Sequence, residues 1–358
     1  MGGLVDQSVP DVSAEAAVPT RATTPMLEVK DLVVHYETRG PGALFGRSQT
    51  VHAVDGIDFA LQTNETLALV GESGCGKSTT GRAALMLERP TSGQVRFEGQ
   101  DLATLPRRQL TAMRRHLQMV FQDPIGSLNA RHTVGYAIAE PLLVHNLRPR
   151  GQRADRVTEL LELVGLPADA ADRYPYEFSG GQCQRIGIAR ALAAEPQFIV
   201  LDEPVSALDV SIQAQILQLL TDLQTRLGLS YLFIAHDLAV VGQMSDRVAV
   251  MYLGQIVEIA ARDSLYTGPM HPYTQALFSA VPEPSVGADR QTVVVSGEVP
   301  SPVDPPAGCR FHTRCPMAQE VCAVEPPTLR DVGSDHQVAC HFAEDAVQAN
   351  PFGLHLEG

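Results

Sequence analysis

Residues 65–78 have the sequence ETLALVGESGCGKS, from which the architecture of the surrounding chain can be predicted. A short apolar run, 65–70, leads into a glycine-rich loop that matches G-x-x-x-x-G-K-[ST], and a helix-compatible segment, 79–87, follows it. A strand, a loop and a helix in this order aim backbone N–H groups and the positive end of a helix dipole at one point. This arrangement predicts a loop that binds phosphate groups.

The loop and the start of the following helix carry the expected nucleotide contacts. Lys77 supplies a positive charge for the β- and γ-phosphates, and Ser78 supplies a hydroxyl ligand for Mg²⁺. Cys75 is interpreted as a small filler rather than a reactive thiol. The residues expected to contact the nucleotide here are Gly71, Glu72, Ser73, Gly74, Cys75, Gly76, Lys77, Ser78 and Thr79.

Two acidic residues follow a second apolar run, 198–201. Asp202 is expected to coordinate Mg²⁺, directly or through water, and Glu203 to polarise an attacking water as a general base. Two acids after a strand can also cap the next helix, but the phosphate loop favours the functional interpretation. His236 follows another apolar run, 231–235, and this position favours a contact with the γ-phosphate or with water over a structural role.

The composition indicates a globular chain with two main parts. Its 358 residues are 44% apolar and 19% charged, which excludes a wholly disordered chain. Strand-type and helix-type runs alternate up to about residue 261, which predicts an α/β core, and the sequence beyond is proline-rich and irregular. The predicted organisation is a disordered tail at 1–25, a nucleotide-binding domain at 26–262, a small irregular cysteine-rich extension at 263–343 and a frayed end at 344–358.

The charge balance and hydropathy limit the possible partners. Lys and Arg total 27 and Asp and Glu total 41, and the resulting net charge of −14 disfavours broad binding to nucleic acid. There is no run of the roughly 18 apolar residues that a membrane span needs, and the first residues do not resemble a secretory signal. We therefore expect a cytoplasmic chain that reaches a membrane only through partner subunits.

Four of the six cysteines lie close together in the extension. Cys309, Cys315, Cys322 and Cys340 have the spacing C-x5-C-x6-C-x17-C. Four thiolates suit either Zn²⁺ or a [4Fe–4S] cluster, and the spacing alone does not choose between them. Ligation would supply folding energy to a lobe with few apolar residues, although four unligated thiols remain an alternative. Further alternative ligands are His312, His336 and His341.

The segment Phe178–Gln182, FSGGQ, precedes a helix-compatible run and forms a second candidate anion site. A serine and two glycines at a helix start expose backbone N–H groups to an anion. One nucleotide has one γ-phosphate, which the phosphate loop already holds. This second helix start is therefore expected to act on a nucleotide carried by another copy of such a domain.

Taken together, the segments GESGCGKS, VFQDP, FSGGQ, VLDEP, SALD and AHD resemble the ATP-binding-cassette ATPases across residues 26–262. The resemblance implies a P-loop ATPase core with a helical subdomain and a β subdomain. It also implies that Tyr36 stacks on adenine, that Gln122 senses Mg²⁺ and the attacking water, and that residues 206–209 cross a dimer interface. The residues implied to contact the partner's γ-phosphate are Ser179, Gly180, Gly181 and Gln182.

The stretches LYTGPMHPYTQALFSAVPEP and VPSPVDPPAGCRFHTRCPMAQEVC resemble the C-terminal extension of oligopeptide and dipeptide importer ATPases. This resemblance implies an ATPase that couples ATP and Mg²⁺ to uptake of dipeptides and oligopeptides, and it favours [4Fe–4S] over Zn²⁺ at the cysteines. The implied partners are a second, different ATPase chain, two permeases whose coupling helix enters a groove beside 122–131, and an extracytoplasmic solute-binding protein. The implied location is the cytoplasmic face of the cell membrane.

Two other classes of protein are less consistent with the sequence. A soluble cassette ATPase that acts on ribosomes or DNA usually carries two cassettes or long coiled-coil insertions, whereas this chain has one cassette and no heptad run. An iron–sulfur redox protein that merely uses ATP would fit the four cysteines, but no flavin motif or second cluster motif accompanies them.

Overall fold

A computed structural model describes residues 24–39, 48–279 and 297–349. Within them, an eight-stranded sheet and a four-stranded antiparallel sheet are combined with helices, so the predicted α/β class is confirmed. Most of the predicted tail at 1–25 lies outside the described residues, as do residues 350–358. The domain boundaries at 25/26 and 262/263 stay predictions.

The larger sheet contains the strands that lead to the predicted site. Its strands are β3 (Thr66–Val70), β6 (Leu117–Val120), β7 (Phe198–Asp202), β8 (Ser230–Ala235), β9 (Arg247–Tyr252), β10 (Gln255–Ala261), β11 (Arg330–Asp331) and β12 (Gln337–Val338). Their spatial order is β11-β12-β10-β9-β3-β8-β7-β6, and the five strands from β9 to β6 run parallel to one another, whereas β10 is antiparallel to β9. β3, β7 and β8 are buried along their whole length, as expected for parallel strands covered on both faces.

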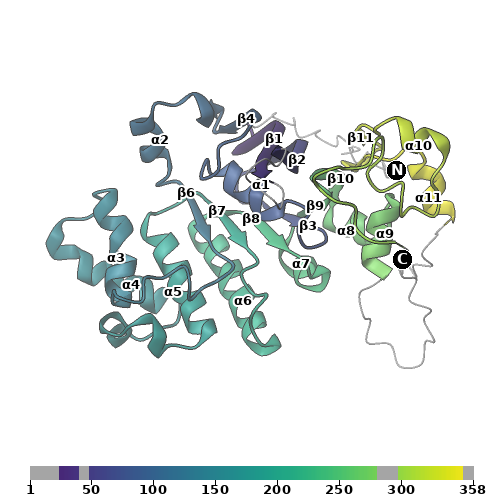
Figure 1. Cartoon of the computed structure of the whole chain (residues 1–358). Coiled ribbons are helices and arrows are strands. Elements are labelled where there is room, and N and C mark those ends of the chain that lie inside the picture. Colours follow the sequence, from purple (N-terminus) through teal and green to yellow (C-terminus); the bar gives the residue numbers. More distant parts are fainter. Residues whose placement is uncertain (1–23, 40–47, 280–296, 350–358) are drawn as a thin grey trace, which may run out of the picture.

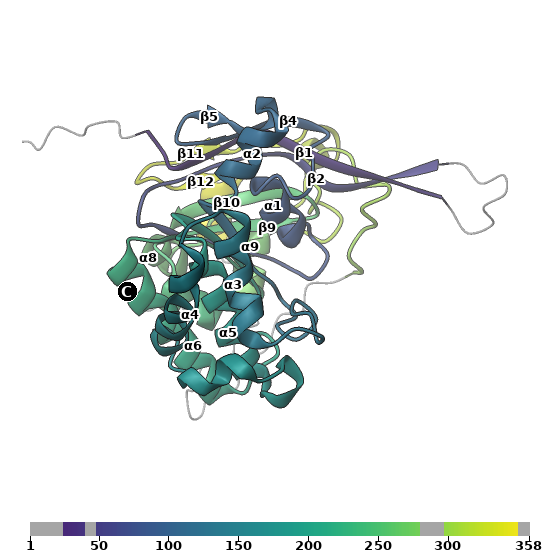
Figure 2. The same ribbon diagram turned by 90° about the vertical axis from the view of Figure 1, so that its left-hand side faces the viewer.

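The smaller sheet is formed by β1 (Leu27–Arg39), β2 (Ser48–Leu61), β4 (Ser92–Phe97) and β5 (Gln100–Asp101) in the order β2-β1-β4-β5. Figure 2 shows β1 and β2 running as a long ribbon past the edge of the body. Helix α1 (Lys77–Ala84) lies between the two sheets, where its alanines share one apolar core with residues of both.

The remaining helices cover the sheets and form the two ends of the molecule. They are α2 (Arg107–Met113), α3 (Val134–Val144), α4 (Arg153–Leu163), α5 (Gly180–Ala193), α6 (Val210–Leu227), α7 (Leu238–Met244), α8 (Arg262–Thr267), α9 (Pro272–Ser279), α10 (Glu320–Val324) and α11 (Ala343–Ala349). Short 3-10 helices occupy Leu102–Thr104, Arg150–Gln152, Ala168–Asp172 and Pro175–Glu177. Figure 1 shows α3, α4 and α5 at one end and α8 to α11 at the other.

The extension joins the larger sheet through a buried polar network. β12 pairs with β10, and Glu258 on β10 is fully buried. Its carboxylate accepts hydrogen bonds from the backbone N–H of Met270 and of His271, at 2.6 and 3.0 Å. His336, beside β12, lies with Nε2 2.7 Å from the same carboxylate. A buried carboxylate needs such partners, so this network fixes the extension on the sheet.

The prediction of a frayed end from residue 344 is wrong for residues 344–349. These residues belong to α11, where the side chains of Ala343 and Ala346 are buried. Gln275 of α9 donates a hydrogen bond from Nε2 to the carbonyl of Ala346 at 3.1 Å. Packing against α9 thus stabilises a helix that is too short to form alone.

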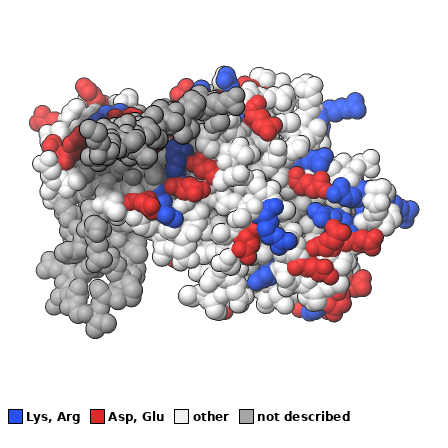
Figure 3. All heavy atoms as spheres, turned by 180° about the vertical axis from the view of Figure 1, so that it is seen from behind, with Lys and Arg blue, Asp and Glu red and all other residues white. Residues whose placement is uncertain are grey.

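The described surface carries charged side chains of both signs (Figure 3). On the described part of the face in Figure 3, basic and acidic side chains are interspersed and form no broad basic surface. Among the described residues, no helix has both the length and the apolar character needed to cross a membrane.

We predict that His336→Ala lowers the free energy of unfolding by about 3 kcal/mol, because it leaves the buried Glu258 carboxylate without its imidazole partner. Denaturant unfolding of the full chain measures the change. His132→Ala is the matched control, since this half-buried ring packs in a tilted arrangement on Tyr136, with ring centroids 4.2 Å apart, and a loss below about 1 kcal/mol is expected there. Equal losses in both variants would contradict the role of the Glu258 network.

Candidate functional site

The phosphate loop connects β3 to α1 as the sequence predicts. At Gly71, with φ +152°, a Cβ would lie 2.1 Å from the carbonyl oxygen of Met251 on β9. At Gly76, with φ +110°, a Cβ would lie 2.1 Å from the carbonyl oxygen of Ala53 on β2. Both positions therefore require glycine, because the loop is pressed against backbone on two sides.

Lys77 lies inside the curve of this loop. Its ammonium donates hydrogen bonds to the carbonyl oxygens of Gly71 and Glu72, at 2.8 and 3.0 Å, and the residue is 5% exposed. Burial raises the pKa of the neighbouring Cys75 thiol, so this side chain stays a neutral filler. The loop thus holds one positive charge at the place where phosphates are expected.

The predicted Mg²⁺ ligands lie side by side. Ser78 at the start of α1 donates a hydrogen bond from Oγ to Oδ1 of Asp202, at the end of β7, over 2.7 Å. Burial of Asp202 raises its pKa, and the hydrogen bond from Ser78 opposes that rise. A hydroxyl and a carboxylate in contact fit the oxygen ligand set that Mg²⁺ prefers.

Glu203, Gln122 and His236 come together at the ends of three neighbouring parallel strands. Nε2 of Gln122 donates to Oε2 of Glu203 at 2.8 Å, and Nδ1 of His236 lies 3.5 Å from the same oxygen. Glu203 has φ +46°, and its backbone N–H donates to the carbonyl of Ile234 on β8 at 3.0 Å. This turn aims the carboxylate into a small cavity that His236 and Ser206 also line.

The predicted adenine contact lies on the smaller sheet. Tyr36 is half-buried on β1, directly opposite Val51 of β2. The start of α5 lies elsewhere: among the described residues, no hydrogen bond or ion pair joins residues 179–182 to the phosphate loop. Ser179 and Gln182 are exposed and cap the helix reciprocally.

Local packing explains the shape of this helix start. Oγ of Ser179 accepts a hydrogen bond from the backbone N–H of Gln182 at 3.4 Å, and Oε1 of Gln182 accepts from the N–H of Ser179 at 3.0 Å. At Gly181 a Cβ would lie 2.6 Å from Cγ2 of Ile212 on α6, so a larger residue would push the helix away. Gly180 in the same turn is half-buried and Gly181 is buried.

The four cysteines of the extension line one small cavity, together with Phe311. The backbone N–H of Cys309 donates to the carbonyl of Cys322 at 2.8 Å, which fixes two of them. Burial raises the pKa of Cys315 to about 11 and that of Cys340 to about 12, so both thiols are neutral without a ligand. All four cysteines thus border the same small cavity.

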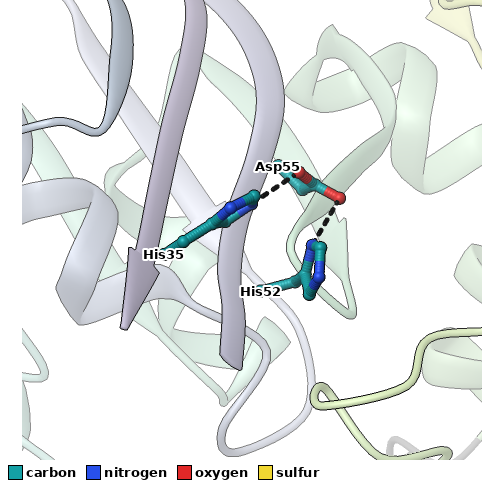
Figure 4. Close-up of side chains that lie close together, drawn as sticks. All are labelled: His35, His52 and Asp55. Carbon is teal, nitrogen blue, oxygen red and sulfur yellow. Dashed lines mark hydrogen bonds and ion pairs between the residues drawn. The ribbon is translucent and has the colours of Figure 1, made fainter. Parts of the chain in front are cut away.

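Figure 4 shows a further cluster, close to Tyr36 along β1, that no sequence motif indicated. Oδ1 of Asp55 lies 2.8 Å from Nε2 of His35, and Oδ2 lies 3.3 Å from Nδ1 of His52. Arg310 also pairs with Asp55. Burial raises the pKa of Asp55, but the bond to His35 and the charge of Arg310 outweigh burial and hold it below its usual range. Because a guanidinium already neutralises this carboxylate, we interpret the cluster as an ion-paired network.

Comparison with known proteins agrees with this geometry. The ABC transporter family matches residues 54–206, and the family described as oligopeptide/dipeptide transporter, C-terminal region, matches residues 257–322. The oligopeptide transport ATP-binding protein AppF of Bacillus subtilis is 51% identical over 88% of this chain and 97% of its own length. A protein of Brucella ovis named as a peptide import ATP-binding protein is 51% identical over 88% of this chain and 98% of its own length.

Solved structures give the same result for the fold. The ATP-binding cassette MJ0796, in a dimeric post-hydrolysis state with ADP and Pi, matches with a TM-score of 0.59 and 28% identity over 66% of this chain and 99% of that one. The protein cbiO1 of Clostridium perfringens matches with a TM-score of 0.57 and 27% identity over 68% of this chain and 90% of that one. The chain therefore belongs to the ABC transporter family, in its oligopeptide/dipeptide branch, and it is an ATPase. The alternative of an ATPase that acts on ribosomes or DNA is not favoured.

We predict that Lys77→Ala weakens ATP binding by about 10- to 100-fold, because a charge-assisted contact to phosphate is worth about 1.5–3 kcal/mol. Equilibrium binding of a fluorescent ATP analogue measures the change. Lys30→Ala is the control, since that lysine pairs with Glu28 on the surface of β1. Unchanged affinity in Lys77→Ala would refute the role of the loop.

Proposed function

We propose that this chain drives the uptake of dipeptides and oligopeptides through partner permease subunits at the cytoplasmic face of the cell membrane. Membership of a transporter family implies such permease partners. The match of residues 257–322 to the oligopeptide/dipeptide transporter C-terminal region is the observation that supports dipeptides and oligopeptides as the substrate. The transported peptide is delivered by an extracytoplasmic solute-binding protein and does not contact this chain.

The nucleotide site is one half of a composite ATP site that two ATPase subunits form together. ATP is held by Tyr36 and residues 71–79, and the start of α5 contacts the nucleotide of a second, different ATPase subunit. Three observations support this: Ser179 and Gln182 are exposed, Val210 beside the predicted interface segment 206–209 is 81% exposed, and a related cassette is a dimer with ADP and Pi. ATP binding favours the closed pair, and hydrolysis followed by product release reopens it.

The residues at the strand ends divide the work of hydrolysis. Ser78 and Asp202 would hold Mg²⁺, which Gln122 would sense, and the ion would neutralise charge on the phosphates. Glu203 takes the proton of the attacking water, since its carboxylate borders the small cavity. Gln122 and His236 contact the same carboxylate oxygen and hold it in place. Each of these three residues follows a different strand, β6, β7 or β8. Proton transfer therefore requires that these strands keep their positions relative to one another.

A groove next to Gln122 supplies a docking place for a permease coupling helix. The groove holds about 370 Å³ between α1, β6, α3 and α5. Its lining includes the exposed apolar side chains of Leu87, Phe121 and Val144. Phe121 directly precedes Gln122, so a helix seated here moves the residue that holds Glu203. A permease helix that docks here therefore acts on the catalytic base Glu203 through one residue, Gln122.

The four cysteines hold a [4Fe–4S] cluster that acts as a structural or sensory group. A tetrahedral zinc site with Zn–S distances of about 2.3 Å brings its sulfurs to roughly 3.8 Å from one another. Among the described residues, His35, His52 and Asp55 form the one trio of metal-ligand side chains whose ligand atoms all lie within 4.8 Å. In this structure at least two sulfurs of any three therefore lie more than 4.8 Å apart. The choice of [4Fe–4S] over Zn²⁺ rests on the resemblance of the extension to that of the peptide-importer ATPases.

We predict that Glu203→Gln, co-expressed with the partner ATPase, still binds ATP but hydrolyses it at least about 100-fold more slowly, because the amide cannot accept the proton. Light scattering in the presence of ATP is expected to show a stable pair of ATPase subunits. Glu159→Gln, on the exposed surface of α4, is the control and keeps normal turnover. Normal turnover in Glu203→Gln would contradict the assigned base.

We also predict that the chain purified without oxygen contains iron and sulfide and absorbs broadly in the blue part of the visible spectrum. Cys340→Ser is expected to lose most of this iron, because one ligand of four is replaced. Cys183→Ala, a buried cysteine outside the group, keeps the iron. A chain that contains zinc and no iron would overturn the cluster assignment.

A further inference from the structure

We propose that the segment Cys309–Cys315 is a positioning element for the nucleotide site of its own chain. It carries two buried arginines, each next to a predicted cluster ligand, and each arginine pairs with a carboxylate of the nucleotide-binding domain. The link to cluster loading rests on the proposed [4Fe–4S] centre, whereas the arginine contacts do not. The segment thereby couples ligation of the cysteines to the affinity for ATP.

Arg314 holds the phosphate loop directly. Its Nη1 lies 3.2 and 3.1 Å from the two carboxylate oxygens of Glu72, and its Nη2 lies 3.2 Å from the first of them. The Arg314 side chain is 7% exposed and the Glu72 side chain 28%, so this forked pair is partly shielded from water. Nη1 also donates to the hydroxyl of Tyr252 at 3.4 Å. Glu72 is the second residue of the loop, and its carbonyl is one of the two that hold Lys77.

The backbone of Glu72 is held by the extension as well. The N–H of Glu72 donates to the hydroxyl of Tyr273 on α9 at 2.9 Å. The ring of Tyr273 packs against Tyr252 and Phe311, with ring centroids 4.6 and 5.5 Å away. Phe311 belongs to the positioning segment and is 1% exposed. One aromatic cluster therefore joins the segment to both the side-chain and the backbone contacts of the loop.

Arg310 holds the opposite side of the site. Its guanidinium pairs with Asp55 on β2 and donates to the carbonyl of Leu253, and its side chain is 8% exposed. Asp55 in turn bonds to His35, which directly precedes Tyr36 on β1 (Figure 4). The arginine therefore fixes the strand pair that carries the predicted adenine contact.

The segment transmits displacement because it is a tight turn. Backbone N–H groups of His312, Arg314 and Cys315 donate to the carbonyls of Cys309, Phe311 and His312, at 3.0, 2.9 and 3.3 Å. A shift of either cysteine therefore moves the adjacent arginine. Breaking a buried ion pair is costly, because the remaining charge loses its partner away from water. Ligated cysteines keep both pairs formed and the phosphate loop ready for ATP.

The expected effect is on binding rather than on the chemical step. Among the described residues, Arg314 bonds to Glu72 and Tyr252 and to none of the residues expected to hold Mg²⁺ or the attacking water, so we expect it to act on the nucleotide through Glu72. Its loss is expected to raise the KM for ATP while kcat at saturating ATP stays within about twofold, since uniform binding is removed. A merely structural role would instead lower the yield of folded protein and leave the KM of the folded fraction unchanged.

The test compares Arg314→Ala, Arg314→Lys and Arg330→Ala in the full chain purified without oxygen, and turnover is measured after each is assembled with the partner ATPase. Arg330 pairs with Glu344 on the surface of the same extension and is the matched control. Iron content, the Kd for a fluorescent ATP analogue, and KM and kcat for ATP are measured on each. We expect Arg314→Ala to raise Kd and KM by about tenfold with normal iron content, Arg314→Lys to recover part of the loss, and Arg330→Ala to behave as the parent.

A second arm removes the cluster from the parent and from Arg314→Ala by chelation after oxidation. Stripping is expected to weaken ATP binding about tenfold in the parent and to add little in Arg314→Ala, because both changes act through one contact. Equal ATP affinity in loaded and stripped parent would overturn the coupling, and unchanged KM in Arg314→Ala would overturn the positioning role. A parent without iron would refute the cluster assignment, while the KM of Arg314→Ala still decides the role of the arginine.

Discussion

The Lys77 ammonium is buried and held by carbonyl oxygens of its own loop, and this contact shapes the whole nucleotide site. A buried positive charge needs close acceptors, so the loop must curve tightly around it. The curve is possible because Gly71 and Gly76 let the loop press against β9 and β2. The extension then holds Glu72 from outside through Arg314 and Tyr273. The loop that curves around the Lys77 charge thus contacts the larger sheet, the smaller sheet and the extension.

The same arrangement explains why the chain needs partners. The carboxyl ends of neighbouring parallel strands bring Gln122, Glu203 and His236 together on one side of the nucleotide. The exposed start of α5 forms no contact with that site within the described residues, so its anion-binding capacity is available to a second subunit. The apolar groove beside Phe121 is the proposed interface with the permease. In this proposal, hydrolysis and permease movement are joined through Gln122.

The sequence could predict the parts of the fold and site that depend on local pattern. The loop, the acids after β7 and the capped start of α5 each lie within a few consecutive residues, and the structure has them as strand, loop and helix in the expected order. The contacts of the extension could not be predicted, because Arg314 and Glu72 are 242 positions apart, and Arg310 and Asp55 are 255 apart. The short helix α11 escaped prediction for the same reason: packing on α9, not its own sequence, stabilises it.

The most direct test is the structure of the Glu203→Gln chain assembled with its partner ATPase, ATP and Mg²⁺. The account predicts that the γ-phosphate on Lys77 also meets the glycine-rich helix start of the partner subunit, and that Ser179 meets the nucleotide held by that partner. If Ser179 instead faced solvent while both nucleotides were bound, the composite site, and the transport mechanism built on it, would be contradicted.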